Sequence, residues 1–184
     1  GNRPCILEEF VDFAIEVSTI SVRDTHGNTF TYPPSENIHK NHILNTSCVP
    51  ASIDQETENT LYEISTKMIK NLNYIGVLAI EFFVLKDNSI LVNEIAPRVH
   101  NSGHWTLDGS DISQFEQHIR AVSQLKILNP KLIFKTKMLN LIGDDVNIWK
   151  DKDNSKNEKI YIYGKTETKK GRKMGHVNFL EEFK

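Results

Sequence analysis

The sequence predicts an α+β fold in which an antiparallel sheet with packed helices is followed by a small β-rich domain. Residues 15–22 alternate between two faces and precede the turn signal His26-Gly27-Asn28, as in an antiparallel meander. Residues 54–73 and 111–123 instead repeat apolar side chains at intervals of three and four, the spacing of an amphipathic helix. Strand-like runs return in residues 129–184. This order of strands and helices favours a mixed fold.

Composition and charge exclude several classes of protein. The chain has 184 residues, a net charge of −2, 39% hydrophobic and 25% charged residues, which suits one globular domain or one domain with a small appendage. No basic surplus is available for a general grip on nucleic acid, and no apolar run reaches the ~20 residues of a membrane helix. With two cysteines and no secretory signal pattern, we expect a cytoplasmic protein.

The first fifty residues read as strands separated by turns. The chain begins with Gly1 and reaches an apolar run at once, so we expect a fragment whose upstream part holds some of the active site. Residues 5–10 are predicted as a short strand. A strand over 29–32 ends at Pro33-Pro34, because proline cannot donate to a ladder. Residues 35–47 are polar and are predicted to be irregular.

A helix and a hairpin are predicted next. Asp54 is a candidate N-cap for the helix over 54–73, whose apolar side chains recur at spacings of three and four: Leu61, Ile64, Met68 and Leu72. Residues 77–84 and 90–95 read as two strands joined by the turn Asp87-Asn88.

The second helix, over 111–123, has Ser113 and Glu116 in the spacing of a capping box. Its predicted inward side chains are Ile112, Phe115, Ile119 and Val122. Pro130 marks a boundary, so we expect one part over 1–128 and a β-rich domain over 129–184. That domain has strands near 138–142 and 159–163 and a charged, solvated loop between them.

The hairpin places two carboxylates opposite each other. If Asp87-Asn88 is a two-residue loop, Glu81 faces Glu94 with Cβ atoms about 5 Å apart. Val77, Ala79, Phe83, Ile90 and Val92 would share that face. Two such charges repel by roughly 3 kcal/mol, which a divalent cation such as Mg²⁺ converts into attraction. The alternative is a glutamate that pairs with a lysine or points to solvent, and a bulge would move one glutamate to the other face.

A polar loop follows this hairpin. Residues 98–104 offer a guanidinium, two imidazoles, an amide and a hydroxyl, a composition suited to binding an anion beside a metal or to a hydrogen-bonded turn. A zinc site would use His100 with His104, or His39 with His42, but neither pair has a third placed ligand. A second, strongly basic loop over 164–176 is an ordinary surface hairpin or an anion site.

The central motifs resemble a known family. Residues 93–98 (Asn-Glu-Ile-Ala-Pro-Arg), 100–104 (His-Asn-Ser-Gly-His) and 113–118 (Ser-Gln-Phe-Glu-Gln-His) are similar to the 5-(carboxyamino)imidazole ribonucleotide synthases, which are ATP-grasp enzymes of purine biosynthesis. Residues 171–176 resemble the family's C-terminal domain. Val99 departs from the family, which usually has a proline there. The resemblance implies the C-terminal half of an ATP-grasp domain followed by a small β-rich domain.

The resemblance also implies roles for individual residues. Arg98 and His100 would be catalytic, and Glu81 and Glu94 would bind Mg²⁺. The implied ATP contacts are Glu8, Glu9, Phe10, Val11, Glu16, His39, Asn93 and Glu94. The implied contacts to bicarbonate and the ribonucleotide are Arg98, His100, Asn101, Ser102, Lys165 and Arg172.

The implied reaction is the ATP-dependent carboxylation of 5-aminoimidazole ribonucleotide with bicarbonate, by way of carboxyphosphate. ATP and Mg²⁺ are the implied cofactors, and the full-length enzyme would be a homodimer without nucleic-acid or membrane partners. The chain alone would be a partial enzyme without activity. Two alternatives are another ATP-grasp ligase, such as a formate-using glycinamide ribonucleotide formyltransferase, and a non-catalytic fragment that folds and dimerises.

Overall fold

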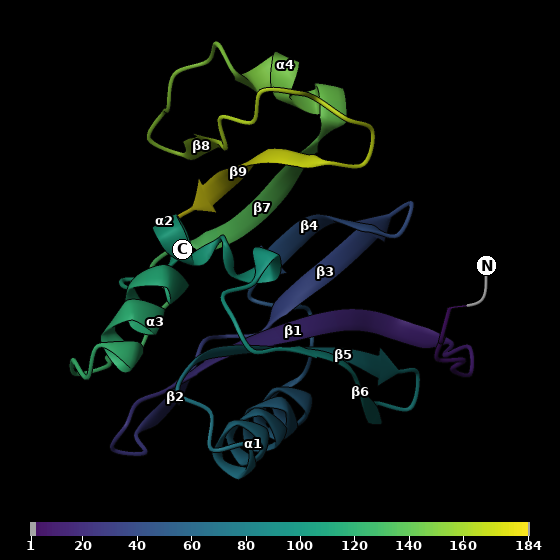
Figure 1. The fold of residues 1–184 in the computed structure, drawn as a ribbon, viewed down its shortest axis with the longest axis vertical. Coiled ribbons are helices and arrows are strands. Elements are labelled where there is room, and N and C mark those ends of the chain that lie inside the picture. Colours follow the sequence, from purple (N-terminus) through teal and green to yellow (C-terminus); the bar gives the residue numbers. More distant parts are fainter. Residues whose placement is uncertain (1–2, 184) are drawn as a thin grey trace.

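The computed structural model describes residues 3–183, and its strands form one antiparallel sheet of nine strands (Figure 1). The sheet order is β6-β5-β1-β3-β4-β7-β9-β8, with β2 paired to β1. The strands are β1 (Phe13–Arg23), β2 (Thr29–Thr31), β3 (Ser35–Lys40), β4 (Ile43–Val49), β5 (Gly76–Leu85), β6 (Ile90–Ala96), β7 (Lys135–Ile142), β8 (Glu158–Ile162) and β9 (Lys173–Glu181). The helices are α1 (Gln55–Asn71), α2 (Thr106–Gly109), α3 (Gln114–Val122) and α4 (Val146–Trp149), with short 3-10 turns at η1 (Asn101–Gly103) and η2 (Gly143–Asp145).

Helix α1 covers one face of the sheet. The Asp54 side chain accepts a hydrogen bond from the Thr57 amide at 2.7 Å, which confirms the predicted N-cap. Leu61 and Ile69 are fully buried in the core on this face. The helix was predicted to run to residue 73 but ends at Asn71, and Leu72, the last of the four periodic apolar residues, is 53% exposed at its C-cap.

Helix α3 lies over the opposite face, and its predicted orientation is wrong in part. Ser113 accepts from the Glu116 amide at 3.1 Å, as predicted. However, Ile119 and Val122 are 58% and 47% exposed, and the helix buries Gln114, Gln117 and Ala121 instead. The two glutamines can be buried because each bonds backbone groups of a neighbouring loop, which apolar periodicity does not register.

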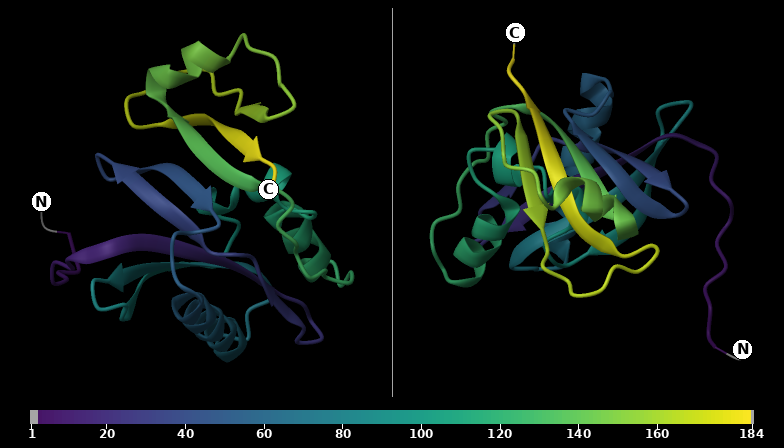
Figure 2. Two further views of the ribbon diagram at one scale, coloured as in Figure 1. Left: turned by 180° about the vertical axis from the view of Figure 1, so that it is seen from behind. Right: turned by 90° about the horizontal axis from the view of Figure 1, so that it is seen from above.

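Two predictions in the first fifty residues are also wrong. Residues 5–10 form no strand, and the segment before β1 extends away from the sheet (Figure 2, right). Residues 35–47 are not irregular but form the β3–β4 hairpin. Its turn residues Asn41 and His42 both have positive φ, at 50° and 61°, which is the geometry of a tight hairpin turn. The polar composition hid a strand pair with one solvated face.

The C-terminal strands continue the same sheet. Strand β7 pairs with β4 from Thr46 to Val49, so the β-rich part is hydrogen-bonded to the rest of the sheet. Strands β7 and β8 match the predicted ones, the intervening residues 150–157 are exposed, and β9 was not predicted. The division at residue 128 stays a prediction. Within residues 3–183, no helix has the length and apolar content needed to cross a membrane.

Candidate active site

The β5–β6 hairpin carries the two predicted carboxylates. Glu81 pairs with Glu94, so the predicted register at this position is confirmed. However, the loop and the strand register that produce this pairing differ from the predicted ones. The Leu85 amide donates to the Ser89 carbonyl at 2.8 Å, which makes the loop one residue longer than predicted, and a β-bulge between Glu81 and Phe82 then shifts the pairing. The longer loop and the bulge each shift the strand register by one residue, in opposite directions, so Glu81 pairs with Glu94 as predicted.

The bulge does change the face of the residues nearer the loop. Ile90 and Val92 pair with Val84 and Phe82, whose side chains belong to the core beneath α1. The prediction that Ile90 and Val92 share the face of Glu81 is therefore wrong, because an extra residue reverses the alternation of side chains. The unpaired residue of the bulge is Asn93, directly beside Glu94.

A cleft of about 520 Å³ opens at this pair of glutamates. It is lined by residues from five separate segments: His39, His42, Ile43, Leu44, Glu81, Glu94, His100, Lys165, Gly171 and Lys173. The fold thus brings five of the predicted site residues to one cavity, with carboxylates on the β5–β6 side and lysines on the C-terminal side. Such a distribution of charge suits a ligand that carries both a metal ion and anionic groups.

The carboxylates have the electrostatic character of a cation site. Burial raises the pKa of Glu81, and the neighbouring carboxylates of Glu16 and Glu94 raise it further. A divalent cation between Glu81 and Glu94 would relieve this repulsion. Within the described residues no three His, Cys, Asp or Glu side chains converge on one point. The structure therefore gives no support to the zinc alternatives. Mg²⁺ takes one or two carboxylates and completes its shell with water and phosphate oxygens, so the Glu81–Glu94 pair is a sufficient protein contribution to such a site.

Glu16 on β1 and His39 on β3 form a second pair, on two neighbouring strands inside the sheet. His39 Nδ1 lies 2.9 Å from Glu16 Oε2, and this contact with a carboxylate raises the pKa of the imidazole. Both side chains also line a smaller hollow of about 270 Å³ beside the start of β1. The predicted adenine segment, Glu8 to Val11, precedes β1; it has no regular structure, and its residues Glu8 to Phe10 are exposed.

His100 is held in the cleft from two sides. The buried Gln114 side chain accepts from the His100 amide at 2.9 Å and donates to its carbonyl at 2.6 Å. The ring nitrogen Nε2 lies 3.6 Å from Glu81 Oε1. Burial lowers the pKa of His100 to about 4, with the nearby charges of Arg98 and Lys173 acting in the same direction. The imidazole is therefore neutral at pH 7.

The other residues of the polar loop occupy different environments. Arg98 is exposed and donates to the Val99 carbonyl at 3.0 Å. The amide oxygen and nitrogen of Asn101 are buried and have no hydrogen-bond partner among the described residues. Ser102 is fully buried, and its hydroxyl lies between Ser18 and His100 rather than in the cleft.

The C-terminal loop contributes cations to the cleft. Lys165 and Lys173 line it, whereas the Arg172 guanidinium is turned toward the Glu167 carbonyl at 3.3 Å, within its own loop. Lys173 was not predicted. It follows Arg172 directly, and the unpaired Met174 forms a β-bulge in β9, opposite Leu141 and Ile142, that changes the register there. The sequence offered one signal for Lys173, which is its position beside the basic loop. The neighbouring bulge could not be predicted, because a bulge has no recognisable sequence pattern.

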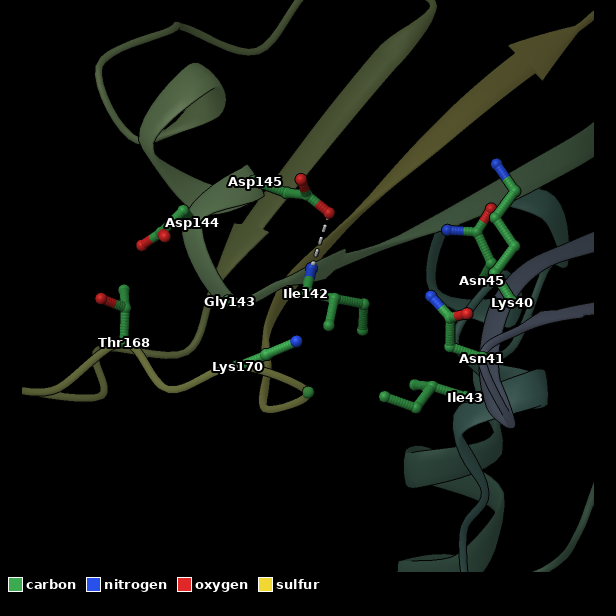
Figure 3. A pocket seen from close by; sticks show the side chains of 11 residues that line it. Lys40, Asn41, Ile43, Asn45, Ile142, Gly143, Asp144, Asp145, Thr168 and Lys170 are labelled. Atoms are coloured by element: carbon green, nitrogen blue, oxygen red, sulfur yellow. Dashed lines mark hydrogen bonds between the residues drawn. The ribbon is translucent and has the colours of Figure 1, made fainter.

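A second cavity, of about 660 Å³, is drawn in Figure 3. It adjoins the cleft, because Ile43 and Gly171 line both. It lies between the β3–β4 turn and residues 142–145 and 168–171. Its charged side chains are of both signs, and Asp145 accepts from the Ile142 amide at 3.2 Å. None of the predicted site residues lines this cavity.

Comparison with known proteins agrees with this geometry. The profile of the ATP-grasp domain matches residues 1–115, the part of the chain that contains the paired glutamates and the polar loop. The chain belongs to the ATP-grasp family. The phosphoribosylaminoimidazole carboxylase C-terminal domain matches residues 136–184, which hold Lys165 and Lys173.

This ATP-grasp chain is similar to several named relatives. It is 48% identical over 179 residues to the N5-carboxyaminoimidazole ribonucleotide synthase of Bacillus subtilis, covering 97% of this chain and 47% of the relative. It is 50% identical over 181 residues to the protein of the same name from Brucella melitensis, covering 98% and 50%. The resemblance found in the sequence is thereby confirmed, and the chain spans about half the length of these relatives.

Solved structures show the same arrangement. An ADP complex of N5-carboxyaminoimidazole ribonucleotide synthetase superposes with a TM-score of 0.91 at 40% identity, covering 96% of this ATP-grasp chain and 47% of the other. The Aspergillus clavatus N5-carboxyaminoimidazole synthase, solved with ADP and 5-aminoimidazole ribonucleotide, superposes with a TM-score of 0.87 at 31% identity, covering 93% and 48%. The predicted α+β class and ATP-grasp fold are confirmed.

A cluster of four rings, one buried and three half-buried, connects the C-terminal strands of this ATP-grasp chain to the polar loop: His176, with His104, Tyr161 and Tyr163. The Tyr163 hydroxyl lies 3.0 Å from His104 Nδ1 and 2.8 Å from His176 Nδ1. His176 stacks on Tyr161 with ring centroids 4.6 Å apart. Burial lowers the pKa of His104 to about 4 and that of His176 to about 3. Both imidazoles are neutral in the folded chain at pH 7.

This cluster predicts a loss of stability in acid. The unfolded chain takes up protons on both histidines below pH ~6.5, whereas the folded chain resists until about pH 4, so stability falls as the pH drops through this window. Each histidine should cost about 2 kcal/mol at pH 5. Urea titrations at pH 7 and pH 5 measure this loss. His176→Phe should reduce it, and His26→Gln, at an exposed histidine, should not; equal losses in wild type and His176→Phe would contradict the argument.

Proposed function

We propose that the protein containing this chain carboxylates 5-aminoimidazole ribonucleotide with bicarbonate at the expense of ATP, in purine biosynthesis. The observation that carries the proposal is the cleft, a single cavity lined by the Glu81–Glu94 pair, His100, Lys165 and Lys173. The names of the relatives and the ribonucleotide in the Aspergillus clavatus structure support it. The proposed class is an ATP-grasp carbon–nitrogen ligase.

The proposed ATP site lies along β1, β3 and β6. Glu16 and His39, already joined to each other, would contact the ribose and its surroundings, and the segment Glu8 to Val11 would lie against adenine. Asn93 and Glu94, placed by the bulge, would face the phosphates. Mg²⁺ bound by Glu81 and Glu94 would supply the positive charge that neutralises the phosphates during transfer.

The proposed chemistry has two steps. An oxygen of bicarbonate attacks the γ-phosphorus of ATP, ADP leaves and carboxyphosphate forms. The exocyclic nitrogen of the ribonucleotide then bonds to the carboxyl carbon, directly or after carbon dioxide is released, while phosphate leaves and the nitrogen loses a proton. His100 and Arg98 would bind the anion by hydrogen bonds, with Asn101 beside them, and Lys165 and Arg172 would bind the ribonucleotide phosphate. Carboxyphosphate is labile in water, so the closed site must exclude solvent.

The test is a reconstituted reaction. The complete polypeptide that contains this sequence should release ADP only when ATP, Mg²⁺, bicarbonate and 5-aminoimidazole ribonucleotide are all present, and should fix labelled bicarbonate into the ribonucleotide. ADP release that requires formate and glycinamide ribonucleotide instead would indicate the formyltransferase alternative. Absence of nucleotide binding would indicate a non-catalytic protein.

We expect residues 1–184 by themselves to have no synthase activity. They span about half the length of their relatives, and ATP-grasp catalysis depends on groups that surround the nucleotide from both sides. Turnover of ATP by purified residues 1–184, dependent on both bicarbonate and the ribonucleotide, would contradict this expectation. The complete polypeptide, assayed in parallel, is the positive control.

We further propose that the complete polypeptide is a cytoplasmic homodimer without nucleic-acid or membrane partners. Cys5 and Cys48 are free thiols, which suits a reducing compartment. Ile119, Val122 and Leu125 form an exposed apolar strip at the end of α3 that is suited to a subunit contact. Sedimentation velocity should show a dimer, and a monomer at all concentrations would refute this part.

A further inference from the structure

A line of buried polar side chains crosses the sheet and ends at His100. It consists of Ser47 on β4, Asn37 on β3, Ser18 on β1 and Ser102 in η1. Their exposed fractions lie between 0% and 5%. Strand register sets the spacing, because Asn37 pairs with Ser47 and Ser18 pairs with Glu81. Burying so many polar groups is costly unless each is hydrogen-bonded, and here each of them is.

The hydrogen bonds of this line all run in one direction. The Ser47 hydroxyl donates to Asn37 Oδ1 at 2.7 Å, and Asn37 Nδ2 donates to the Ser18 hydroxyl at 3.0 Å. Ser18 in turn donates to the Ser102 hydroxyl at 2.7 Å. Ser102 Oγ lies 2.9 Å from His100 Nδ1. Each hydroxyl has a single proton. Because the proton of Ser18 goes to Ser102, the Ser35 hydroxyl, which lies 2.9 Å from Ser18 Oγ, is the donor in its own contact with Ser18.

This direction determines which ring nitrogen of His100 holds the proton. Among the described residues the Ser102 hydroxyl contacts only Ser18, from which it accepts, and His100 Nδ1, so His100 Nδ1 is the acceptor within reach of its own proton. The Ser102 backbone amide is also directed at Nδ1, at 3.4 Å, so two donors converge on this nitrogen. Nδ1 is therefore the acceptor, and the proton of the neutral ring lies on Nε2. That N–H faces Glu81 Oε1, 3.6 Å away, and the cleft.

We propose that Ser18 and Ser102 are positioning residues that hold His100 in its Nε2–H tautomer and direct this N–H into the cleft. The proposal refines the proposed function, on which its catalytic part rests: the N–H would donate to an oxygen of the anionic substrate. It also changes the role of Ser102. The resemblance implies a substrate contact for this residue, whereas its hydroxyl is already engaged between Ser18 and His100.

The tautomer can be measured without any assay of activity. In the complete polypeptide labelled with ¹⁵N-histidine, two-bond ¹H–¹⁵N correlations at neutral pH should show His100 Nδ1 unprotonated and Nε2 protonated. Loss of the single donor hydroxyl in Ser102→Ala should lower the ratio of the Nε2–H to the Nδ1–H tautomer by about fivefold or more, so that the two nitrogen shifts move toward each other. Ser18→Ala should move the two His100 nitrogen shifts in the same direction by a smaller amount. It replaces Ser102→Ala as the test if that variant does not fold.

Ser65→Ala is the matched control. Ser65 is fully buried like Ser102, but its hydroxyl bonds Thr19 at 2.7 Å on the α1 side of β1. This variant should lose stability without changing the His100 shifts. In the carboxylation assay, Ser102→Ala should lower kcat about five- to tenfold with the KM for ATP unchanged, and Ser65→Ala should not.

Two results would overturn the proposal: a wild-type His100 protonated on Nδ1, or identical His100 shifts in wild type and in both Ser102→Ala and Ser18→Ala. Either result would do so even if carboxylation is confirmed. Conversely, the predicted tautomer shifts in a polypeptide that does not carboxylate the ribonucleotide would support the positioning role and refute the proposed function.

Discussion

In the complete polypeptide, Glu94→Gln should lower the turnover of ATP, bicarbonate and the ribonucleotide by about 100-fold or more while leaving the fold intact. Glu94 is exposed at the cleft and faces Glu81, so its carboxylate is not needed for packing. The amide keeps the shape but removes the negative charge that would bind Mg²⁺, and a catalytic metal contributes several kcal/mol to such a transfer. The measurement is kcat as a function of Mg²⁺ concentration, together with the melting temperature.

Glu63→Gln provides the matched control, because Glu63 is an exposed glutamate on the solvent side of α1, away from the cleft. It should keep wild-type turnover. For Glu94→Gln, higher Mg²⁺ should recover part of the activity if the defect lies in metal affinity. Near-normal turnover of Glu94→Gln at limiting Mg²⁺ would show that the paired glutamates do not hold the metal.

The second large effect concerns the phosphate of the ribonucleotide. Lys165→Ala should raise the KM for 5-aminoimidazole ribonucleotide by about one to two orders of magnitude, since a charge-assisted hydrogen bond is worth roughly 1.5–3 kcal/mol. Arg172→Ala should have an effect of the same size. Lys165 already lines the cleft, whereas Arg172 must turn away from the Glu167 carbonyl to reach the same phosphate. The KM for ATP should change little in either variant.

Lys169→Ala tests whether any positive charge in this loop is enough to bind the ribonucleotide phosphate. Lys169 lies in the same basic loop, but its ammonium is paired with Glu167 at 3.2 Å. It should leave both Michaelis constants near their wild-type values. Equal effects of Lys165→Ala and Lys169→Ala would indicate general attraction rather than a specific contact, and an effect confined to ATP would assign the loop to the nucleotide.

The candidate site was more predictable than the packing around it. Glu81 and Glu94 could be paired from the hairpin alone, although the pairing is correct because a longer loop and a bulge compensate each other. Periodicity failed at α3, where buried Gln114 bonds the backbone of His100 and Ile119 is exposed. Polar side chains with long-range partners carry no periodic signal, because their partners lie far away along the chain.

The same limit applies to the residues that complete the cleft. The β3–β4 hairpin was hidden by its polar composition. Lys173 reaches the cleft beside a bulge in a strand that was not predicted. Ser18 alternates correctly in the sequence, yet its role depends on contacts with Asn37 and Ser102, which only the folded sheet brings together. Strand pairing over long separations is set by the whole fold rather than by local preference.

The pairing of β4 with β7 has a consequence for how the molecule can be divided. Backbone hydrogen bonds join the part matched by the ATP-grasp profile to the part matched by the carboxylase C-terminal domain. Cutting the chain near residue 128 and separating the pieces would break the pairing of β4 with β7, while β4 stays paired with β3 and β7 with β9. The two strand edges exposed in this way are templates for aggregation. The residues on both sides of the cleft are therefore held by one continuous sheet, and we expect neither part to fold correctly when it is produced alone.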